Sequence, residues 1–166
     1  QDKWESAVNG AISFSDSLSK VENTNISLVT FSGSASIATE FSHTALTARD
    51  FGHPEGNTNL QAGLSNAIDK LKEITDPNAQ KYIVVIGDGQ PTSGGSNGKS
   101  ATDRAMDRAY EAKNDNKITV FSIGYGIEND ATAKDVLKKI SSDTTMTRVY
   151  GYRDYYYEYN KEEKGF

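Results

Sequence analysis

The sequence predicts an α/β fold: a doubly wound, mostly parallel sheet with one antiparallel edge strand and helices on both faces. Three observations support it. Short apolar runs alternate along the chain with longer segments of helical periodicity, as in folds built from parallel strands and crossover helices. The run at 83–86 (Ile-Val-Val-Ile) contains no polar residue, which indicates a strand buried on both faces. Segments 26–31 and 34–41 are separated only by a turn signal, which predicts an antiparallel pair.

The first half of the chain is predicted to form a helix, the antiparallel pair, a polar loop and a second helix. Apolar residues recur at helical spacing from Trp4 to Val21, which predicts an amphipathic helix with Trp4 as a core anchor. Residues 42–57 are polar and predict a loop. Its histidines, His43 and His53, are interpreted as exposed loop residues because no other soft metal ligand accompanies them.

The second half continues this alternation. Residues 60–71 predict a helix that ends before Asp76-Pro77. Residues 92–99 are rich in serine and glycine and predict an exposed loop. The loop leads into Gly-Lys-Ser, but a phosphate-binding loop needs glycine at position 93, where this sequence has serine, so we expect no phosphate site. The remaining predicted elements are a helix at 100–114, a strand at 118–124, a helix at 130–140, an irregular segment at 141–154, a strand at 155–159 and a closing helix from residue 161.

Tyrosines gather near the end of the chain. Strand alternation predicts that about half of those within the last strand point inward. Tyrosine suits partly exposed contact surfaces, and the two that precede the predicted strand are the better candidates for one. The cluster consists of Tyr150, Tyr152, Tyr155, Tyr156, Tyr157 and Tyr159, of which Tyr150 and Tyr152 come first.

Length and composition exclude several classes of protein. The 166 residues suffice for one domain with a sizeable core, and the net charge of -5 disfavours nucleic acid as a partner. The absence of cysteine excludes disulfides, thiol catalysis and thiolate metal sites. No apolar stretch approaches the ~20 residues of a membrane span. No Ser-His-Asp arrangement or pair of carboxylates stands out, so we do not expect an enzyme.

Two residues with oxygen side chains stand out by their context. Asp88 follows the carboxyl end of the buried strand, where open α/β sheets bind ligands, and Gly87 and Gly89 leave room for a cation. Thr58 lies in a polar loop immediately before the helix at 60–71. Taken singly, Thr58 is better interpreted as a helix cap and Asp88 as a turn former. Taken together, in this order, they predict a more specific site.

In that order and context, the two residues resemble the von Willebrand factor A domain, the family that includes the inserted domain of integrins. The resemblance extends from Trp4 to about Phe166. That family binds a metal ion through an Asp-x-Ser-x-Ser loop, a threonine, and an aspartate in an Asp-Gly-x-Pro-like turn. Thr58 matches the second element and Asp88 the third.

The resemblance also implies a rim of loop residues around the metal that contacts the ligand. For each of these residues, helix capping or turn hydrogen bonds are an interpretation at least as good. The implied rim residues are Asn57, Asn59, Gln90 and Thr92.

The sequence departs from the family at the first element of the metal site. Asp16-Ser17-Leu18-Ser19 has serines at the wrong offsets and lies in a helical pattern. In the family, the Asp-x-Ser-x-Ser loop follows the central first strand and precedes the first helix. We therefore expect a single domain, 1–166, that lacks this strand and most of the last helix.

The missing strand has an energetic consequence. Each buried unpaired backbone group costs about 1–3 kcal/mol, whereas a whole domain is stable by only ~5–15 kcal/mol. The chain is therefore not expected to form a closed sheet alone. A complementary segment of the same protein or a partner chain would supply the strand.

The resemblance implies a metal-dependent adhesion domain of a cell-surface protein, a bacterial adhesin or pilus tip protein, located outside the cell or on its wall. A divalent cation (Mg²⁺ first, with Mn²⁺ or Ca²⁺ as options) would coordinate an acidic group of the ligand once the missing loop is supplied. The ligand would be a protein or glycan of a host or neighbouring cell. The alternative is an intracellular scaffold subunit of an ATPase or chelatase-type complex.

Overall fold

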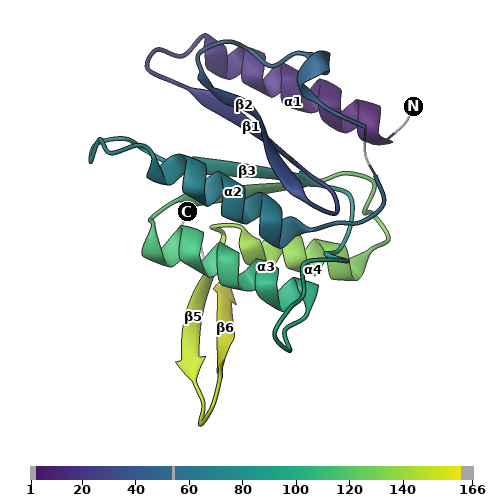
Figure 1. The fold of residues 1–166 in the computed structure, drawn as a ribbon, viewed down its shortest axis with the longest axis vertical. Helices are drawn as coiled ribbons and strands as arrows, with labels where there is room; N and C mark the ends of the chain where they lie inside the picture. Colours follow the sequence, from purple (N-terminus) through teal and green to yellow (C-terminus); the bar gives the residue numbers. More distant parts are fainter. Residues whose placement is uncertain (1–2, 54, 162–166) are drawn as a thin grey trace.

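The computed structural model describes residues 3–53 and 55–161. Helices and strands alternate along the chain, which confirms the predicted α/β class (Figure 1). The predicted closing helix lies outside the described residues. The elements are α1 (Lys3–Ser19), β1 (Ile26–Phe31), β2 (Ala35–Ser42), the 3-10 turn η1 (Ala48–Asp50), α2 (Leu60–Lys72), β3 (Tyr82–Gly87), α3 (Ala101–Tyr110), the π-helical turn η2 (Glu111–Asp115), β4 (Thr119–Gly124), α4 (Ala131–Ile140), β5 (Thr144–Tyr150) and β6 (Tyr155–Lys161).

Within the described ranges, the strands form three separate two-stranded sheets instead of one continuous sheet. β1 and β2 are antiparallel, as predicted. β3 and β4 are parallel and in register from Tyr82 opposite Thr119 to Gly87 opposite Gly124. The single, mostly parallel sheet is not seen, because β1 and β3 share no ladder hydrogen bonds and line a cavity between them.

The prediction of an irregular segment at 141–154 is wrong, because this segment contains β5. Buried Thr144 and Met146 alternate with exposed Thr145 and Thr147, the period of a strand with one covered face. β5 pairs with β6 over seven residue pairs without a register shift. This second antiparallel pair forms a hairpin that projects from the rest of the molecule (Figure 1).

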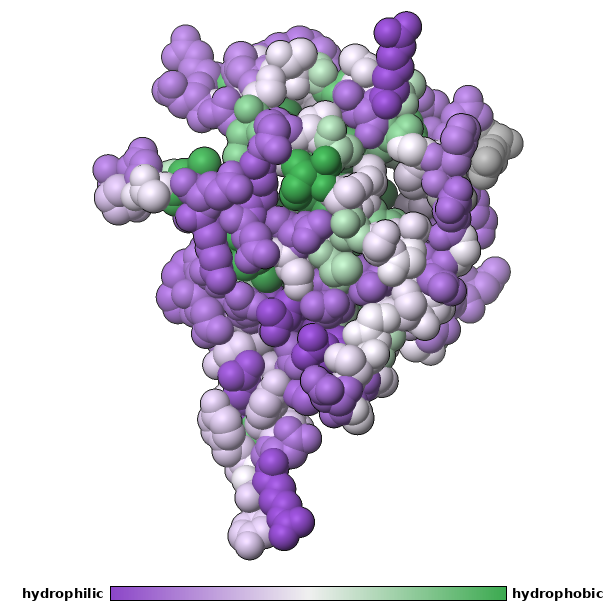
Figure 2. Space-filling model, viewed as in Figure 1, coloured by the Kyte–Doolittle hydropathy of each residue, from purple (hydrophilic) through white to green (hydrophobic). Residues whose placement is uncertain are grey.

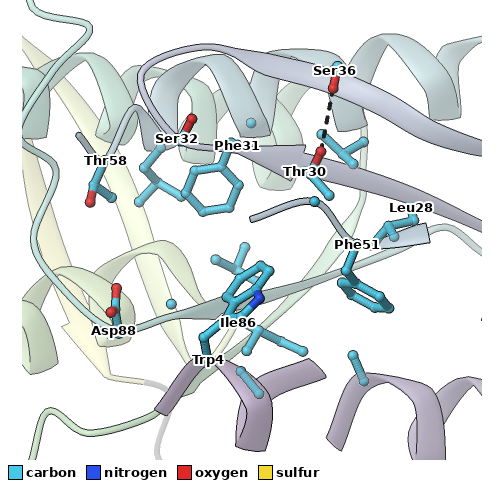
Figure 3. Close-up of a pocket in the computed structure, with 18 of the residues that line it drawn as sticks. Trp4, Leu28, Thr30, Phe31, Ser32, Ser36, Phe51, Thr58, Ile86 and Asp88 are labelled. Atoms are coloured by element: carbon cyan, nitrogen blue, oxygen red, sulfur yellow. Dashed lines mark hydrogen bonds between the residues drawn. The ribbon is translucent and has the colours of Figure 1, made fainter. Parts of the chain in front are cut away.

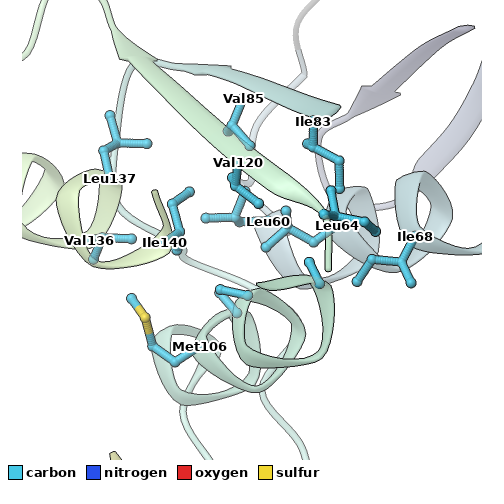
Figure 4. Packing of buried hydrophobic residues seen from close by; sticks show 14 of the residues in the cluster. Leu60, Leu64, Ile68, Ile83, Val85, Met106, Val120, Val136, Leu137 and Ile140 are labelled. Atoms are coloured by element: carbon cyan, nitrogen blue, oxygen red, sulfur yellow. The ribbon is translucent and has the colours of Figure 1, made fainter. Parts of the chain in front are cut away.

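The main hydrophobic core lies between the β3–β4 pair and helices α2, α3 and α4 (Figure 4). β3 contributes Ile83 and Val85, whose side chains point to the same face of the strand. Close approach of α2 to β1 requires a glycine, since a Cβ on Gly63 would lie 2.9 Å from the Phe31 ring. The largest fully buried side chains of the core are Leu64, Ile68, Val120 and Ile140.

Helix α1 lies beside the β1–β2 pair and outside the main core (Figure 1). Its buried residues are Val8, Ala11 and Ser15, so the apolar stripe is narrower than the sequence pattern predicts. Phe14, at 46% exposure, points to solvent. Ser15 takes part in packing because its Oγ accepts a hydrogen bond of 2.9 Å from the backbone N–H of Leu46.

The junction between α4 and β5 is closed by Lys113. Its ammonium donates hydrogen bonds of 2.8 to 2.9 Å to the carbonyl oxygens of Lys139, Ser141 and Thr144. Burial of the side chain lowers the pKa of Lys113 to about 8. The cation therefore satisfies carbonyls at the helix end, at the cost of desolvating its charge.

The pH dependence of stability tests this lysine through Lys113→Met. The folded pKa of about 8 lies below the ordinary 10.5, so between these values the unfolded chain binds more protons. The penalty for the buried charge is complete below pH 8 and disappears as pH rises to 10.5. In urea unfolding, the stability of the wild type relative to the variant should increase across this window. Parallel pH profiles would contradict the lowered pKa.

A second stability prediction concerns the core. Ile140 is completely buried, so Ile140→Ala should lower the free energy of unfolding by about 2–5 kcal/mol through lost burial and an unfilled cavity. Val21 is 52% exposed, and Val21→Ala should change the free energy of unfolding by less than about 0.5 kcal/mol. Equal effects in chemical denaturation would show that the core is not where the packing places it.

Candidate functional site

A cavity of about 390 Å³ separates β1 from β3. Apolar residues of α1 and α2 contribute to its walls, and the aromatic rings of Trp4, Phe31 and Phe51 line it (Figure 3). Trp4 contacts Phe51 edge-on, with ring centroids 6.5 Å apart. Trp4 is therefore a half-buried wall of this cavity and not the predicted anchor of the main core. Hydrophobic residues are visible within a hollow of the surface, surrounded by hydrophilic ones (Figure 2).

The backbone edges of two strands face this cavity. β1 pairs only with β2, and β3 pairs only with β4, among the strands that the structure describes. The second edge of each strand therefore has no ladder partner, although residues 28–31 of β1 and 83–87 of β3 line the cavity. Apolar walls combined with free N–H and C=O groups suit an extended peptide segment.

Thr58 and Asp88 lie at the same end of the cavity (Figure 3). Asp88 directly follows β3 and is exposed, whereas Thr58 is half-buried in the loop before α2. Neither the hydroxyl of Thr58 nor the carboxylate of Asp88 has a hydrogen-bond or ion-pair partner within the described part of the chain. The oxygens of both groups are thus available to coordinate a cation.

The N-cap of α2 is Asn59 and not Thr58, so the capping interpretation of Thr58 is wrong. The side-chain oxygen of Asn59 accepts a hydrogen bond of 3.1 Å from the backbone N–H of Ala62. Asn59 also ties down the β1–β2 turn, since its amide donates to the carbonyl of Gly33 and its backbone N–H to the carbonyl of Ser32. A helix cap therefore also positions a neighbouring loop.

The loop after β3 is clamped to Thr58 by its backbone. The N–H groups of Thr92 and Ser93 donate to the carbonyl of Thr58 at 2.9 and 3.2 Å. In return, the N–H of Thr58 donates to Thr92 Oγ1 at 2.8 Å. These bonds use the backbone of Thr58 and leave its hydroxyl free.

The predicted rim residues divide into two groups. The side chains of Asn59 and Thr92 hold loops together and are already hydrogen-bonded. Asn57 and Gln90 are exposed, and their side chains have no hydrogen-bond partner in residues 3–53 and 55–161. Of the four, Asn57 and Gln90 are the ones free to contact a ligand.

Thr58 and Asp88 supply only two of the oxygen ligands that a divalent metal site needs. No group of three or more His, Asp or Glu side chains that could hold a metal occurs in the part of the chain that the structure describes. A threonine hydroxyl and a carboxylate are oxygen ligands of the kind Mg²⁺ prefers, but Mg²⁺ requires about six. Thr58 and Asp88 fit the ion as two ligands, and the others would come from elsewhere.

The lysine of the Gly-Lys-Ser sequence at 98–100 has a structural role. The Lys99 ammonium donates to Asp107 Oδ2 at 3.1 Å and to the hydroxyl of Tyr155 at 2.7 Å. The Lys99 side chain is thereby committed to α3 and the hairpin. His43 is likewise engaged, since its Nδ1 lies 2.7 Å from the carbonyl oxygen of Thr24.

Sequence reasoning missed that Asn59 caps α2, and it missed the aromatic lining of the cavity. The position of Asn59 directly before Leu60, the first residue of the apolar pattern, was the available signal, because asparagine is among the strongest N-cap residues. No local signal marks Phe51, which comes to the cavity from a loop.

Comparison with known proteins identifies the family that this chain resembles. The family model of the von Willebrand factor type A domain matches residues 1–160. Inter-alpha-trypsin inhibitor heavy chain H2 of pig (Sus scrofa) and of human (Homo sapiens) are each 32% identical to this chain over 108 residues. These matches cover 61% of this chain and 11% of each relative's length. None of the described helices is long and apolar enough to cross a membrane.

The packing of the clamped loops is tested by Gly94→Ala. Gly94 has a φ of +96°, and a Cβ there would overlap the side-chain amide of Asn59. We expect a loss of about 1–3 kcal/mol in the free energy of unfolding from backbone strain and displacement of Asn59. Gly52→Ala is the control, since a Cβ at Gly52 meets no atom within 4 Å. If both variants unfold at the same denaturant concentration, the Gly94–Asn59 contact does not matter.

Proposed function

The chain belongs to the von Willebrand factor type A family, and from this premise we propose that it is a metal-dependent ligand-binding domain of a cell-surface protein. Domains of this family mediate protein interactions. The observation that carries the proposal is the placement of Thr58 and Asp88: two free oxygen donors lie at one end of a cavity, on loops that are clamped together.

The chain's own residues would hold the ion and present it to the ligand. Thr58 and Asp88 contribute two oxygens to a divalent cation, Mg²⁺ first and Mn²⁺ or Ca²⁺ as options. When bound, the cation supplies a positive centre that attracts a carboxylate of the ligand. Asn57 and Gln90 lie exposed in the same two loops and contact the ligand's neighbouring groups.

The cavity would receive the remaining part of the site. We propose that an extended segment, from the same protein or a partner chain, inserts between β1 and β3 and carries an Asp-x-Ser-x-Ser loop at its carboxyl end. β1 and β3 each have six residues, so a strand of about six residues, ~20 Å long, matches them. Walls of α1 and α2 on its two sides favour a continuously apolar segment.

The proposed setting is outside the cell, as part of a bacterial adhesin or pilus tip protein. A polar, tyrosine-rich and cysteine-free composition suits an exposed surface domain. The partner would be a protein or glycan of a host or neighbouring cell. Carboxylates, which bind a divalent cation directly, are the group we expect on that partner.

Calorimetry with Mg²⁺ tests the metal site. The chain alone should not bind, whereas the chain with a peptide carrying an apolar strand and an Asp-x-Ser-x-Ser loop should. Thr58→Ala should weaken this binding and Asp88→Ala should abolish it, because each removes an oxygen ligand. Asp69→Asn removes an exposed carboxylate of α2 and should have no effect.

Two results of the same titration would contradict the proposal. Tight binding of Mg²⁺ by the chain alone would show that other residues complete the site. An absence of binding even with the peptide would favour the intracellular scaffold role over metal-dependent adhesion.

Insertion of the strand has its own readout. Trp4 is the single tryptophan of the chain and lines the cavity, so its fluorescence should change when the peptide binds, with or without Mg²⁺. The peptide should also raise the unfolding temperature, since it binds the folded state. A peptide with charged residues at alternate strand positions is the control. If both peptides act alike, the cavity does not select an apolar strand.

A further inference from the structure

The end of the β5–β6 hairpin exposes aromatic rings far from the cavity described above. Tyr150, Tyr152 and Tyr156, here called the tyrosine tip, are 74%, 95% and 56% exposed. The hairpin projects from the body of the molecule, so these side chains are displayed at an extremity (Figure 1). Large exposed side chains gathered at one place indicate a contact surface.

The inner face of the hairpin is fixed to α3 through Asp107, which is only 5% exposed. Asp107 Oδ1 accepts hydrogen bonds from the hydroxyls of Tyr155 and Tyr157 at 2.8 and 2.7 Å, and its Oδ2 accepts one from Lys99. Burial alone would raise the pKa of Asp107, but these donors outweigh it and hold the pKa below its usual value. The carboxylate therefore stays charged and anchors the hairpin.

A cation stacked between tyrosines stiffens the hairpin further. The Arg148 guanidinium lies 4.3 Å from the ring centre of Tyr110 on α3 and 4.4 Å from that of Tyr155. It also donates a hydrogen bond of 3.0 Å to the hydroxyl of Tyr157. Cation–π contacts and buried hydrogen bonds fix the hairpin before any ligand arrives, which reduces the entropy lost on binding.

The chemistry at the turn is aromatic, polar and without net charge. Arg153 and Asp154 are adjacent and opposite in charge, and the Arg153 guanidinium lies 5.4 Å from the ring centre of Tyr152. Flat rings beside hydroxyl, guanidinium and carboxylate groups match a sugar, whose C–H faces stack on rings while its hydroxyls form hydrogen bonds. The net charge of -5 disfavours acidic sugars.

From these observations we propose that the tyrosine tip binds a neutral glycan, independently of any metal. The chemical class is a chain of hexose or N-acetylhexosamine units. This site is separate from Thr58 and Asp88, and it does not require a segment in the cavity. The glycan proposal can therefore be tested independently of the proposed metal-dependent function.

The experiment uses the whole chain and a panel of immobilised oligosaccharides, neutral and acidic, in EDTA. We expect binding to at least one neutral glycan. Tyr152→Ala should weaken it about tenfold or more, since one well-packed ring contact is removed. Tyr152→Phe keeps the ring and should retain most of the affinity.

Two further alanine variants and one control complete the test. Tyr150 shares a hairpin face with Tyr155, and Tyr156 lies on the opposite face, so at least one of Tyr150→Ala and Tyr156→Ala should also weaken binding. Tyr82→Ala is the control, because Tyr82 is 51% exposed on β3, away from the hairpin. The Tyr82→Ala variant should bind the glycan with the affinity of the wild type.

Several results would overturn the proposal. These are no binding to any neutral glycan, binding only to acidic glycans, binding that requires Mg²⁺, or binding that Tyr152→Ala leaves unchanged. Because the Tyr152 side chain is almost fully exposed, the variant should unfold at the wild-type temperature, and a loss of binding then reports on the contact alone.

Discussion

The main constraint on this structure is that one backbone edge of β1 and one of β3 have no strand partner. Each strand has one paired edge and one free edge, and the free edges line the same apolar cavity. A buried N–H or C=O without a partner is costly, so such a gap favours a segment that satisfies both edges at once. The division into separate sheets and the open cavity between β1 and β3 both follow from this gap.

Helix α2 connects the two parts that the gap separates. Gly63 of this helix approaches Phe31 of β1, while Leu64 and Ile68 pack in the core beneath β3. At its N-terminus, Asn59 caps the helix and binds the β1–β2 turn, and the neighbouring Thr58 is clamped to the loop after β3. The same contacts that hold the two parts together therefore also set the positions of Thr58 and Asp88.

Two charged side chains, Asp107 and Arg148, fix the hairpin that exposes the tyrosine tip. Asp107 accepts hydrogen bonds from two tyrosine hydroxyls and from Lys99, whereas Arg148 stacks against tyrosine rings and donates one hydrogen bond to Tyr157. The alternation of strand side chains then sends Tyr155, Tyr157 and Tyr159 inward and Tyr156 outward, which is more than the half that the sequence predicts to point inward. The anchored inner face of β6 and its exposed outer face have the same origin, the period of two along the strand.

The sequence by itself determined the class of fold and the order of elements up to α4, because periodicity and turn residues are local signals. The assignment of Thr58 and Asp88 as metal ligands stays a prediction. From the absence of an Asp-x-Ser-x-Ser loop, the sequence also predicted a missing strand, which stays a prediction. Only the tertiary structure decided that Asn59 also holds the β1–β2 turn, that Thr92 is a clamp, and that 144–150 is a strand. The clamp depends on Thr58, 34 residues before Thr92, and β5 depends on pairing with Tyr155–Lys161. No local pattern reports which distant group satisfies a hydrogen bond.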